Sequence, residues 1–225
     1  MNCGEIIAEL KARGDPANVA GMARYGINTA AAVGISVTAL REMAKSIGRD
    51  HELAKRLWQS GIHEARILAT LVAEPKELTR GLANKWVADL NSWDLCDLLC
   101  NNLLVYTDFA WDKAAQYTRR KPTFVKRAGF TLIACLAVHD KAASDARFIE
   151  WLSVIAHSAT DERNYVKKAV NWALRQIGKR NAGLNEAAIA AAEKIRKLDS
   201  KSARWIASNA ARELKSEKVR RRLGC

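Results

Sequence analysis

Apolar residues recur along this chain at steps of three and four, and the every-second-residue alternation typical of β-strands is almost absent. Alanine is abundant, and only three prolines interrupt the pattern. We expect Pro75 and Pro122 to start helices or to separate them, and Asp161 and Ser200 to be helix N-caps. The pattern predicts an all-α fold.

A short motif with a basic residue in its third place returns four times, beginning at residues 64, 125, 166 and 202. The last two spacings, 41 and 36 residues, are close to the two-helix HEAT-like repeat of about 40 residues. Stacked pairs of this kind predict an α-solenoid over residues 1–225, a single HEAT-like repeat domain with a curved, concave basic surface. The basic tail, residues 216–225, is interpreted as a solvated, frayed terminus rather than as a DNA-binding arm.

Winding the segments at 100° per residue predicts which side chains lie outside the core. In residues 92–106, Leu95, Leu98, Leu99 and Tyr106 fall on the core side. Trp93 and Asp97 fall together on the opposite face. An indole outside the core stripe and one turn from a carboxylate marks a candidate contact site. The plain alternative is that Trp93 packs against a neighbouring repeat while Asp97 caps a helix or pairs with an arginine.

Two later segments place basic side chains opposite their apolar faces. After Pro122, Arg127 points away from the apolar face that includes Ala128 and Leu132. In residues 165–179, the face opposite the apolar stripe carries Lys168, Asn171, Trp172, Arg175 and Lys179. These positions agree with a basic surface along the predicted solenoid.

Charge is divided unevenly along the chain. The 225 residues carry 37 Lys and Arg against 24 Asp and Glu, a net charge of +13. Residues 1–110 hold 12 basic and 13 acidic side chains, whereas residues 111–225 hold 25 and 11, so the halves carry −1 and +14. This division favours a polyanion bound mainly by the C-terminal half, with nucleic acid the first candidate and an acidic membrane surface the second. A generically basic solvated surface is the alternative.

Several classes of chemistry lack their usual signatures. The five cysteines have no CxxC spacing and the four histidines are scattered, with His63 and His157 expected on helix surfaces. No phosphate-binding glycine loop, dinucleotide fingerprint or nucleophile elbow occurs. No apolar run is long enough to span a bilayer, and the first ten residues, which include Glu5 and Glu9, do not read as a secretory signal. We therefore expect a cytoplasmic protein.

At this point the residues resemble a family. Residues 22–25, 33–35, 57–58, 64–66, 92–97, 125–128 and 170–175 resemble, in order, the AlkD-like DNA alkylation repair enzymes, which are HEAT-like repeat DNA glycosylases. The resemblance covers roughly residues 17–215. Its most specific part is Trp-Asp-x-x-Asp at 93–97, followed about 75 residues later by Trp-x-Leu-Arg at 172–175.

The resemblance implies excision of positively charged N3- or N7-alkylated purines such as 3-methyladenine and 7-methylguanine from duplex DNA, without metal or cofactor. We also expect a monomer in the bacterial cytosol or nucleoid. It assigns Asp97 as the catalytic carboxylate, with Trp93 and Trp172 flanking the sugar and backbone of the lesion. It assigns Arg127 and Arg175 to the DNA backbone and Tyr25 to the neighbourhood of the duplex. Lys126, Lys167 and Lys168 are further candidate phosphate contacts. A few members carry a second Trp before the Asp motif, where this chain has Ser92.

The remaining tryptophans and Asp94 receive structural interpretations. Asp94 is expected to support its helix or to contact a neighbouring basic residue. Five tryptophans are expected to pack between repeats: Trp58, Trp86, Trp111, Trp151 and Trp205. Two other functions stay open, a non-enzymatic protein that binds branched or bent DNA and a HEAT-type scaffold for an acidic protein partner. The sequence does not rank one lesion above another.

Overall fold

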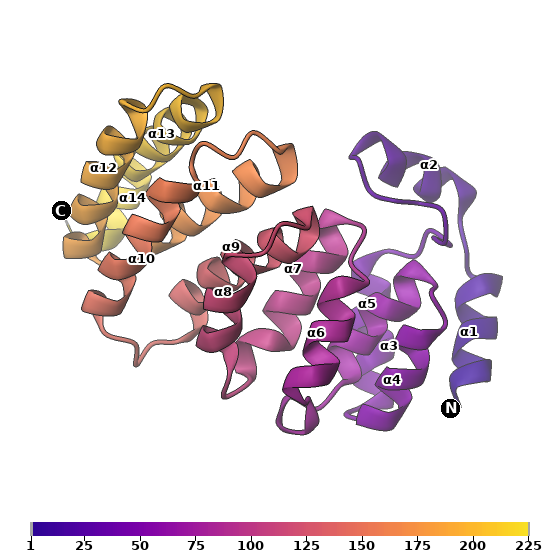
Figure 1. Cartoon of the computed structure of the whole chain (residues 1–225). Coiled ribbons are helices and arrows are strands. Elements are labelled where there is room, and N and C mark those ends of the chain that lie inside the picture. The colour runs from indigo at the N-terminus through magenta and orange to yellow at the C-terminus, as the bar shows by residue number, and fades with distance from the viewer. Residues whose placement is uncertain (1, 225) are drawn as a thin grey trace. The chain divides into compact units, whose positions relative to one another are not determined.

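A computed structural model describes residues 2–224, which contain helices and loops but no strand (Figure 1). The all-α prediction is confirmed. The helices are α1 (Cys3–Ala12), α2 (Pro16–Arg24), α3 (Val37–Ile47), α4 (His51–Gln59), α5 (His63–Val72), η1 (Pro75–Glu77), α6 (Arg80–Ala88), α7 (Trp93–Asn102), η2 (Leu104–Tyr106), α8 (Ala110–Thr118), α9 (Thr123–His139), α10 (Asp145–Ser158), α11 (Asn164–Gly178), α12 (Ala182–Arg196), α13 (Lys201–Leu214) and α14 (Glu217–Leu223).

The helices form two compact units, Met1–Ala110 and Trp111–Cys225, which we call unit 1 and unit 2. The boundary coincides with the division used above to count charge, so unit 1 carries −1 and unit 2 carries +14. No helix among residues 2–224 is long and apolar enough to cross a membrane.

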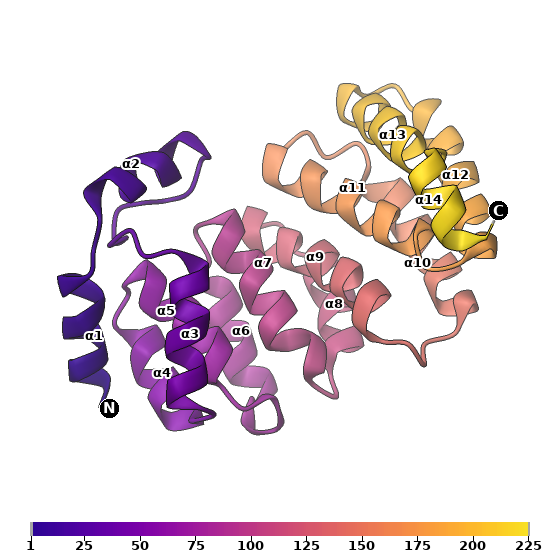
Figure 2. The same ribbon diagram turned by 180° about the vertical axis from the view of Figure 1, so that it is seen from behind.

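In unit 1, α5 is the central helix and packs against α3, α4 and α7 (Figure 2). Leu57, Leu68, Leu95 and Leu99 from these helices are fully buried or nearly so. Trp58 stacks on Trp86 with 4.3 Å between the ring centroids, so the packing predicted for these two indoles is confirmed. The unit therefore has an apolar core on which its loops can be fixed.

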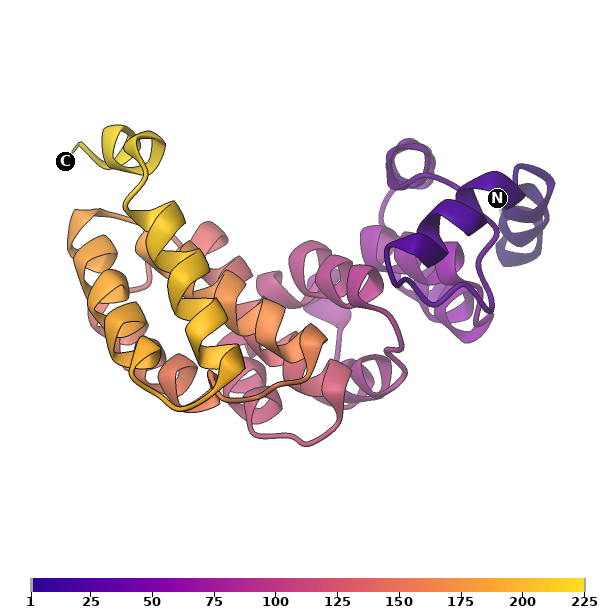
Figure 3. The ribbon, with the colours of Figure 1, turned by 90° about the horizontal axis from the view of Figure 1, so that it is seen from above.

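In unit 2, α11 lies between α9 and α13, and α12 packs on both α10 and α13. Figure 3 shows α12 and α13 side by side in orange and yellow. Gly129 lets α9 approach α8 closely, because a Cβ there would lie 2.5 Å from the backbone nitrogen of Thr118.

The tryptophans of unit 2 follow the packing prediction in part. The rings of Trp111 and Trp151 stack with 6.3 Å between their centroids, as predicted. Trp205 is a partial exception, because 39% of its surface is exposed.

Helix boundaries confirm some sequence expectations and correct others. Ser200 caps α13 through a hydrogen bond from the Ala203 N–H, Pro75 begins η1 and Pro122 directly precedes α9. Asp161 is not an N-cap, because α11 begins at Asn164 with Arg163 in that position. The tail is also not frayed throughout, since Ser216 caps α14 and Val219 is buried.

Candidate active site

Trp93 and Asp97 lie one turn apart at the start of α7, and both are half-buried. Leu95, Cys96, Leu99 and Cys100 form the buried face of the same helix, as the winding predicts for Leu95 and Leu99, whereas Leu98, predicted on the same side, is only half-buried. The prediction for Tyr106 is wrong, because α7 ends at Asn102 and Tyr106 lies in η2 with 53% of its surface exposed. Helical geometry therefore places an indole and a carboxylate side by side outside the core.

The indole of Trp93 is held by a residue far away in sequence. Its Nε1–H donates a hydrogen bond of 3.1 Å to the backbone carbonyl of Tyr25. Tyr25 is the C-cap residue directly after α2, and its side chain is 77% exposed. Unit 1 thus brings together three of the predicted site residues, Tyr25, Trp93 and Asp97.

A polar network surrounds the first turn of α7. The Asp94 carboxylate accepts a hydrogen bond from the Ser92 hydroxyl and lies 2.8 Å from Nε2 of His63. Burial alone would raise the pKa of Asp94, but the hydrogen bond and charge of His63, together with the Ser92 and Leu95 donors, hold that pKa below its usual value. The expectation that Asp94 contacts a basic residue is confirmed. The expectation that His63 lies on a helix surface is wrong, since it is buried, whereas His157 is exposed.

Glu64, next to His63 on α5, is a fully buried carboxylate. Its two oxygens accept the backbone N–H groups of Val33 and Gly34 at 2.8 and 2.7 Å. Gly34 has a φ of +90°, and a Cβ there would lie 2.2 Å from the carbonyl oxygen of Asp15, so the loop requires glycine. α5 therefore fixes the loop that follows α2.

In unit 2, the predicted polar face of α11 is largely covered by α13. Pairs of residues meet along the two helices: Lys167 with the Trp205 ring at 5.1 Å, Asn171 with Asn209 at 2.7 Å, Arg175 with Glu213, and Lys179 with Glu213 at 2.7 Å. Asn171 is only 2% exposed, so its predicted place on an open face is wrong. Trp172 is half-buried and Lys168 is exposed.

Arg127 does not point away from the core as predicted. It is 5% exposed, and Nη1 donates to the carbonyl of Tyr165 at 2.7 Å. Lys126 is also engaged within unit 2, where it forms an ion pair of 3.0 Å with Asp161. Of the four recurring basic residues, Arg66 and Arg127 bind backbone carbonyls, while Lys168 and Arg204 are exposed.

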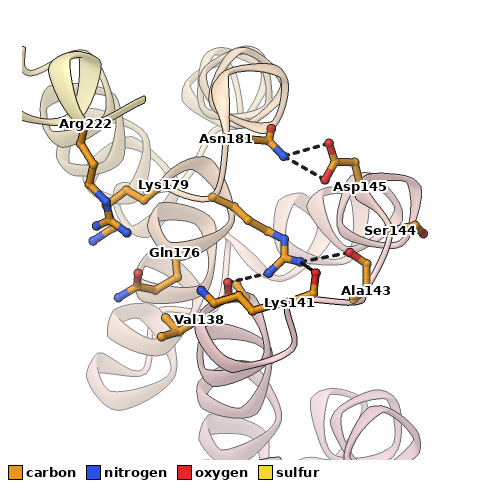
Figure 4. Close-up of a pocket in the computed structure, with 11 residues that line it drawn as sticks. Val138, Lys141, Ala143, Ser144, Asp145, Gln176, Lys179, Asn181 and Arg222 are labelled. Carbon is orange, nitrogen blue, oxygen red and sulfur yellow. Dashed lines mark hydrogen bonds between the residues drawn. The ribbon is translucent and has the colours of Figure 1, made fainter. Parts of the chain in front are cut away.

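Unit 2 also contains an open cavity of about 370 Å³ between α9, α11 and α14 (Figure 4). Arg180 beside it donates to the carbonyls of Ala137, Lys141 and Ala143, and Asn181 donates to Asp145. None of the predicted site residues lines this cavity. Within residues 2–224, no group of three His, Cys, Asp or Glu side chains is arranged to hold a metal ion.

Comparison with known proteins agrees with this architecture. The sequence matches the family model described as DNA alkylation repair enzyme over residues 6–214. The chain belongs to the DNA alkylation repair enzyme family. No curated protein matches the sequence.

A solved structure similar to this family member confirms the HEAT-like repeat fold. It is described as a new family of proteins related to the HEAT-like repeat DNA glycosylases with affinity for branched DNA structures. The likeness covers 100% of this chain and 97% of the other, with a TM-score of 0.84 and 23% identity.

For this member of the DNA alkylation repair family, sequence reasoning missed the residues that organise the candidate site. His63, Glu64 and Ser92 were not assigned to the site, although 64 and 92 stand inside the matched motifs. The available signal was the position of Glu64 at the start of a helix with many apolar residues, because an acidic side chain needs a partner when it is buried.

Proposed function

We propose that this protein is a DNA glycosylase that hydrolyses the N-glycosidic bond of cationic N3- or N7-alkylated purines in duplex DNA. The observation that carries the proposal is the pair formed by Trp93 and Asp97 on α7, with the indole fixed by the Tyr25 carbonyl. Family membership supports the repair role.

The chemistry needs few groups, because an alkylated purine is already cationic and leaves without protonation by a strong acid. As the bond from C1′ to the purine nitrogen breaks, its electron pair leaves with the base and cancels the positive charge. The sugar becomes oxocarbenium-like. The Asp97 carboxylate stabilises that charge and accepts the proton of the water that attacks C1′. The products are the free neutral base and an abasic sugar.

The Trp93 indole supports the same charge through its electron-rich face, with a contribution of about 0.5–2 kcal/mol. A ring held by its Nε1–H presents that face in one orientation, which costs less entropy than a freely rotating ring. The role that the resemblance assigns to Trp172, contact with the sugar and backbone of the lesion, stays a prediction.

DNA binding by unit 2 is proposed from its charge of +14 and from exposed Lys168. Arg175, Lys126 and Lys167 have partners within unit 2, so each must exchange or share a contact to reach a phosphate. Arg127 is buried and donates a hydrogen bond to the Tyr165 carbonyl. Its contact with DNA stays a prediction.

The second candidate is a protein that binds branched DNA without turnover, since affinity for branched DNA is the property named for the structural neighbour. The deciding experiment is base release from methylated duplex DNA by wild type, Asp97→Asn and the control Asp108→Asn, which changes an exposed carboxylate of unit 1. We expect release of 3-methyladenine or 7-methylguanine well above the spontaneous rate. Asp97→Asn should lower the single-turnover rate by about 100-fold or more without weakening duplex binding, and Asp108→Asn should behave like wild type.

If the wild type and Asp97→Asn both give only the spontaneous rate while DNA binding persists, the binding-only function replaces the enzyme. Release of hypoxanthine, a neutral base, as fast as 7-methylguanine would contradict the proposed mechanism. If no duplex or branched DNA is bound in a salt-sensitive way, a protein scaffold becomes the better description.

A further inference from the structure

The segment of residues 25–34, which we call the strap, connects α2 to the loop before α3 and lies against α5 and α7. Its backbone is held at successive points by side chains or backbone of those two helices. The Tyr25 carbonyl accepts from Trp93 Nε1 and the Asn28 N–H donates to the Ser92 hydroxyl. The Ala31 carbonyl accepts from the His63 N–H, and Glu64 accepts from the last two residues of the strap.

Two separate anchors can be distinguished along the strap. Glu64 fixes its C-terminal end through the N–H groups of Val33 and Gly34. The N-terminal end, which carries the carbonyl that orients Trp93, is fixed from α7. That second anchor passes through Ser92 to Asp94.

In this second anchor, the single hydrogen of the Ser92 hydroxyl determines which group donates and which accepts. A serine hydroxyl has one hydrogen and two lone pairs. The Ser92 hydroxyl gives its hydrogen to Asp94 Oδ1, so its lone pairs are turned to the Asn28 N–H at 3.4 Å. The other oxygen of Asp94 is occupied by His63 Nε2 at 2.8 Å, which fixes the carboxylate in turn. In this series of hydrogen bonds, His63 therefore orients the Asp94 carboxylate, and Asp94 orients the Ser92 hydroxyl toward the strap.

We propose that Asp94 is a positioning residue for the candidate site: through Ser92 and His63 it fixes the strap, and the strap's Tyr25 carbonyl fixes the indole of Trp93 beside Asp97. The effect on catalysis rests on the proposed glycosylase function, whereas the effect on the strap does not. Asp94 itself contacts no reacting atom in this scheme.

The test is Asp94→Asn, which preserves shape but places an amide NH₂ where an acceptor for Ser92 or His63 is needed. The matched control is Asp89→Asn, because Asp89 accepts a 2.9 Å hydrogen bond from Nε1 of Trp58 elsewhere in unit 1. Each variant removes one carboxylate charge from unit 1. Only Asp94→Asn changes a residue of the anchor that holds the strap.

Two readouts separate positioning from general damage. Hydrogen exchange of Asn28 should be faster in Asp94→Asn, while Val33 and Gly34, which Glu64 holds, should keep their protection. Single-turnover excision at saturating methylated duplex should fall by about 10- to 100-fold, with the duplex dissociation constant within about twofold of wild type, since no phosphate contact is lost. Asp89→Asn should leave both readouts at the wild-type level.

Faster exchange with an unchanged excision rate would overturn the positioning role, and unchanged exchange at Asn28 would overturn the anchor itself. A wild type without excision activity would defeat the proposed function alone, because the exchange measurement still decides whether Asp94 holds the strap. Should Asp94→Asn fail to fold, Ser92→Ala removes the hydroxyl that joins Asp94 to the Asn28 N–H and leaves the Asp94 contact with His63 in place. It gives the same two readouts under the same criteria.

Discussion

Asp161 shows how one carboxylate can organise a helix start in unit 2. Its side chain is 11% exposed and accepts hydrogen bonds from Arg163 and Lys126 at 2.6 and 3.0 Å. The Arg163 guanidinium, followed by Lys126, holds the pKa of this carboxyl well below its usual range despite partial burial. The residue that the sequence pattern indicates as a cap is therefore an ion-pair centre just before α11.

The lowered pKa of Asp161 predicts a pH-dependent contribution to stability. A carboxyl whose folded pKa lies below its unfolded value, about 3.9, stabilises the fold above that value and loses the contribution as pH falls through the folded pKa. Asp161→Asn should lower the free energy of unfolding by about 1–3 kcal/mol at pH 7. The difference from wild type should narrow below about pH 4.

Urea unfolding at pH 7, 5 and 4 and at lower pH where the protein remains folded measures this difference. The control is Asp199→Asn, because Asp199 is fully exposed and its contact with Arg204 is 3.3 Å, so this variant should unfold like wild type. A constant difference between Asp161→Asn and wild type across the whole range would show that charge is not the cause.

At the scale of helices, paired side chains cover the polar face of α11 in unit 2. The contacts between α11 and α13 use positions 167, 171, 175 and 179, spaced one turn apart, facing 205, 209 and 213. A helix in a stacked repeat buries one face in its own pair and another against the next helix. For that reason a basic stripe on α11 forms an interface rather than an open surface.

Gly129 tests a second close approach in unit 2, that of α9 to α8. In Gly129→Ala the new methyl group would lie 2.5 Å from the backbone nitrogen of Thr118, so α9 and α8 must separate. The expected loss is about 1–3 kcal/mol in the free energy of unfolding. Gly183→Ala on α12 is the control, because its Cβ makes only an ordinary contact of 3.7 Å, and its stability should be unchanged or slightly higher. Equal stabilities in thermal unfolding would contradict the packing argument.

At the scale of the whole molecule, charge distinguishes the two units more clearly than fold does. Both are helical, but unit 1 carries −1 and unit 2 carries +14. Many cations of unit 2 are engaged with carboxylates, carbonyls or rings. Those that are exposed, including Lys168 and Arg204, remain able to meet a polyanion.

The double variant Lys168→Ala/Arg204→Ala should weaken duplex binding and lower the slope of log affinity against log salt by about one to two. Lys45→Ala/Lys55→Ala is the matched pair in unit 1, where both lysines lie on helix surfaces beside glutamates, and should bind nearly as wild type does. Fluorescence anisotropy between 50 and 200 mM salt, a range chosen because counterion release is large there, distinguishes the two. Equal losses in both variants would argue against a special role for unit 2.

The sequence by itself determined what depends on neighbours along the chain. Periodicity predicted the helices and the shared face of Trp93 and Asp97, because residues three or four apart meet on any helix. The cap at Ser200 follows from its side-chain oxygen, which can accept a hydrogen bond from an N–H of the first helical turn. The family motifs indicated the HEAT-like fold for the same reason, since each repeat is a local unit.

Only the tertiary structure decided which polar side chains turn inward. The Tyr25 carbonyl meets Trp93, and His63 meets Asp94, across gaps in sequence that no helical period spans. Winding a helix identifies its most apolar face, but it does not reveal that a neighbour covers a second face, as α13 covers Asn171. A buried polar group is stable only with a partner, and that partner is set by packing between helices.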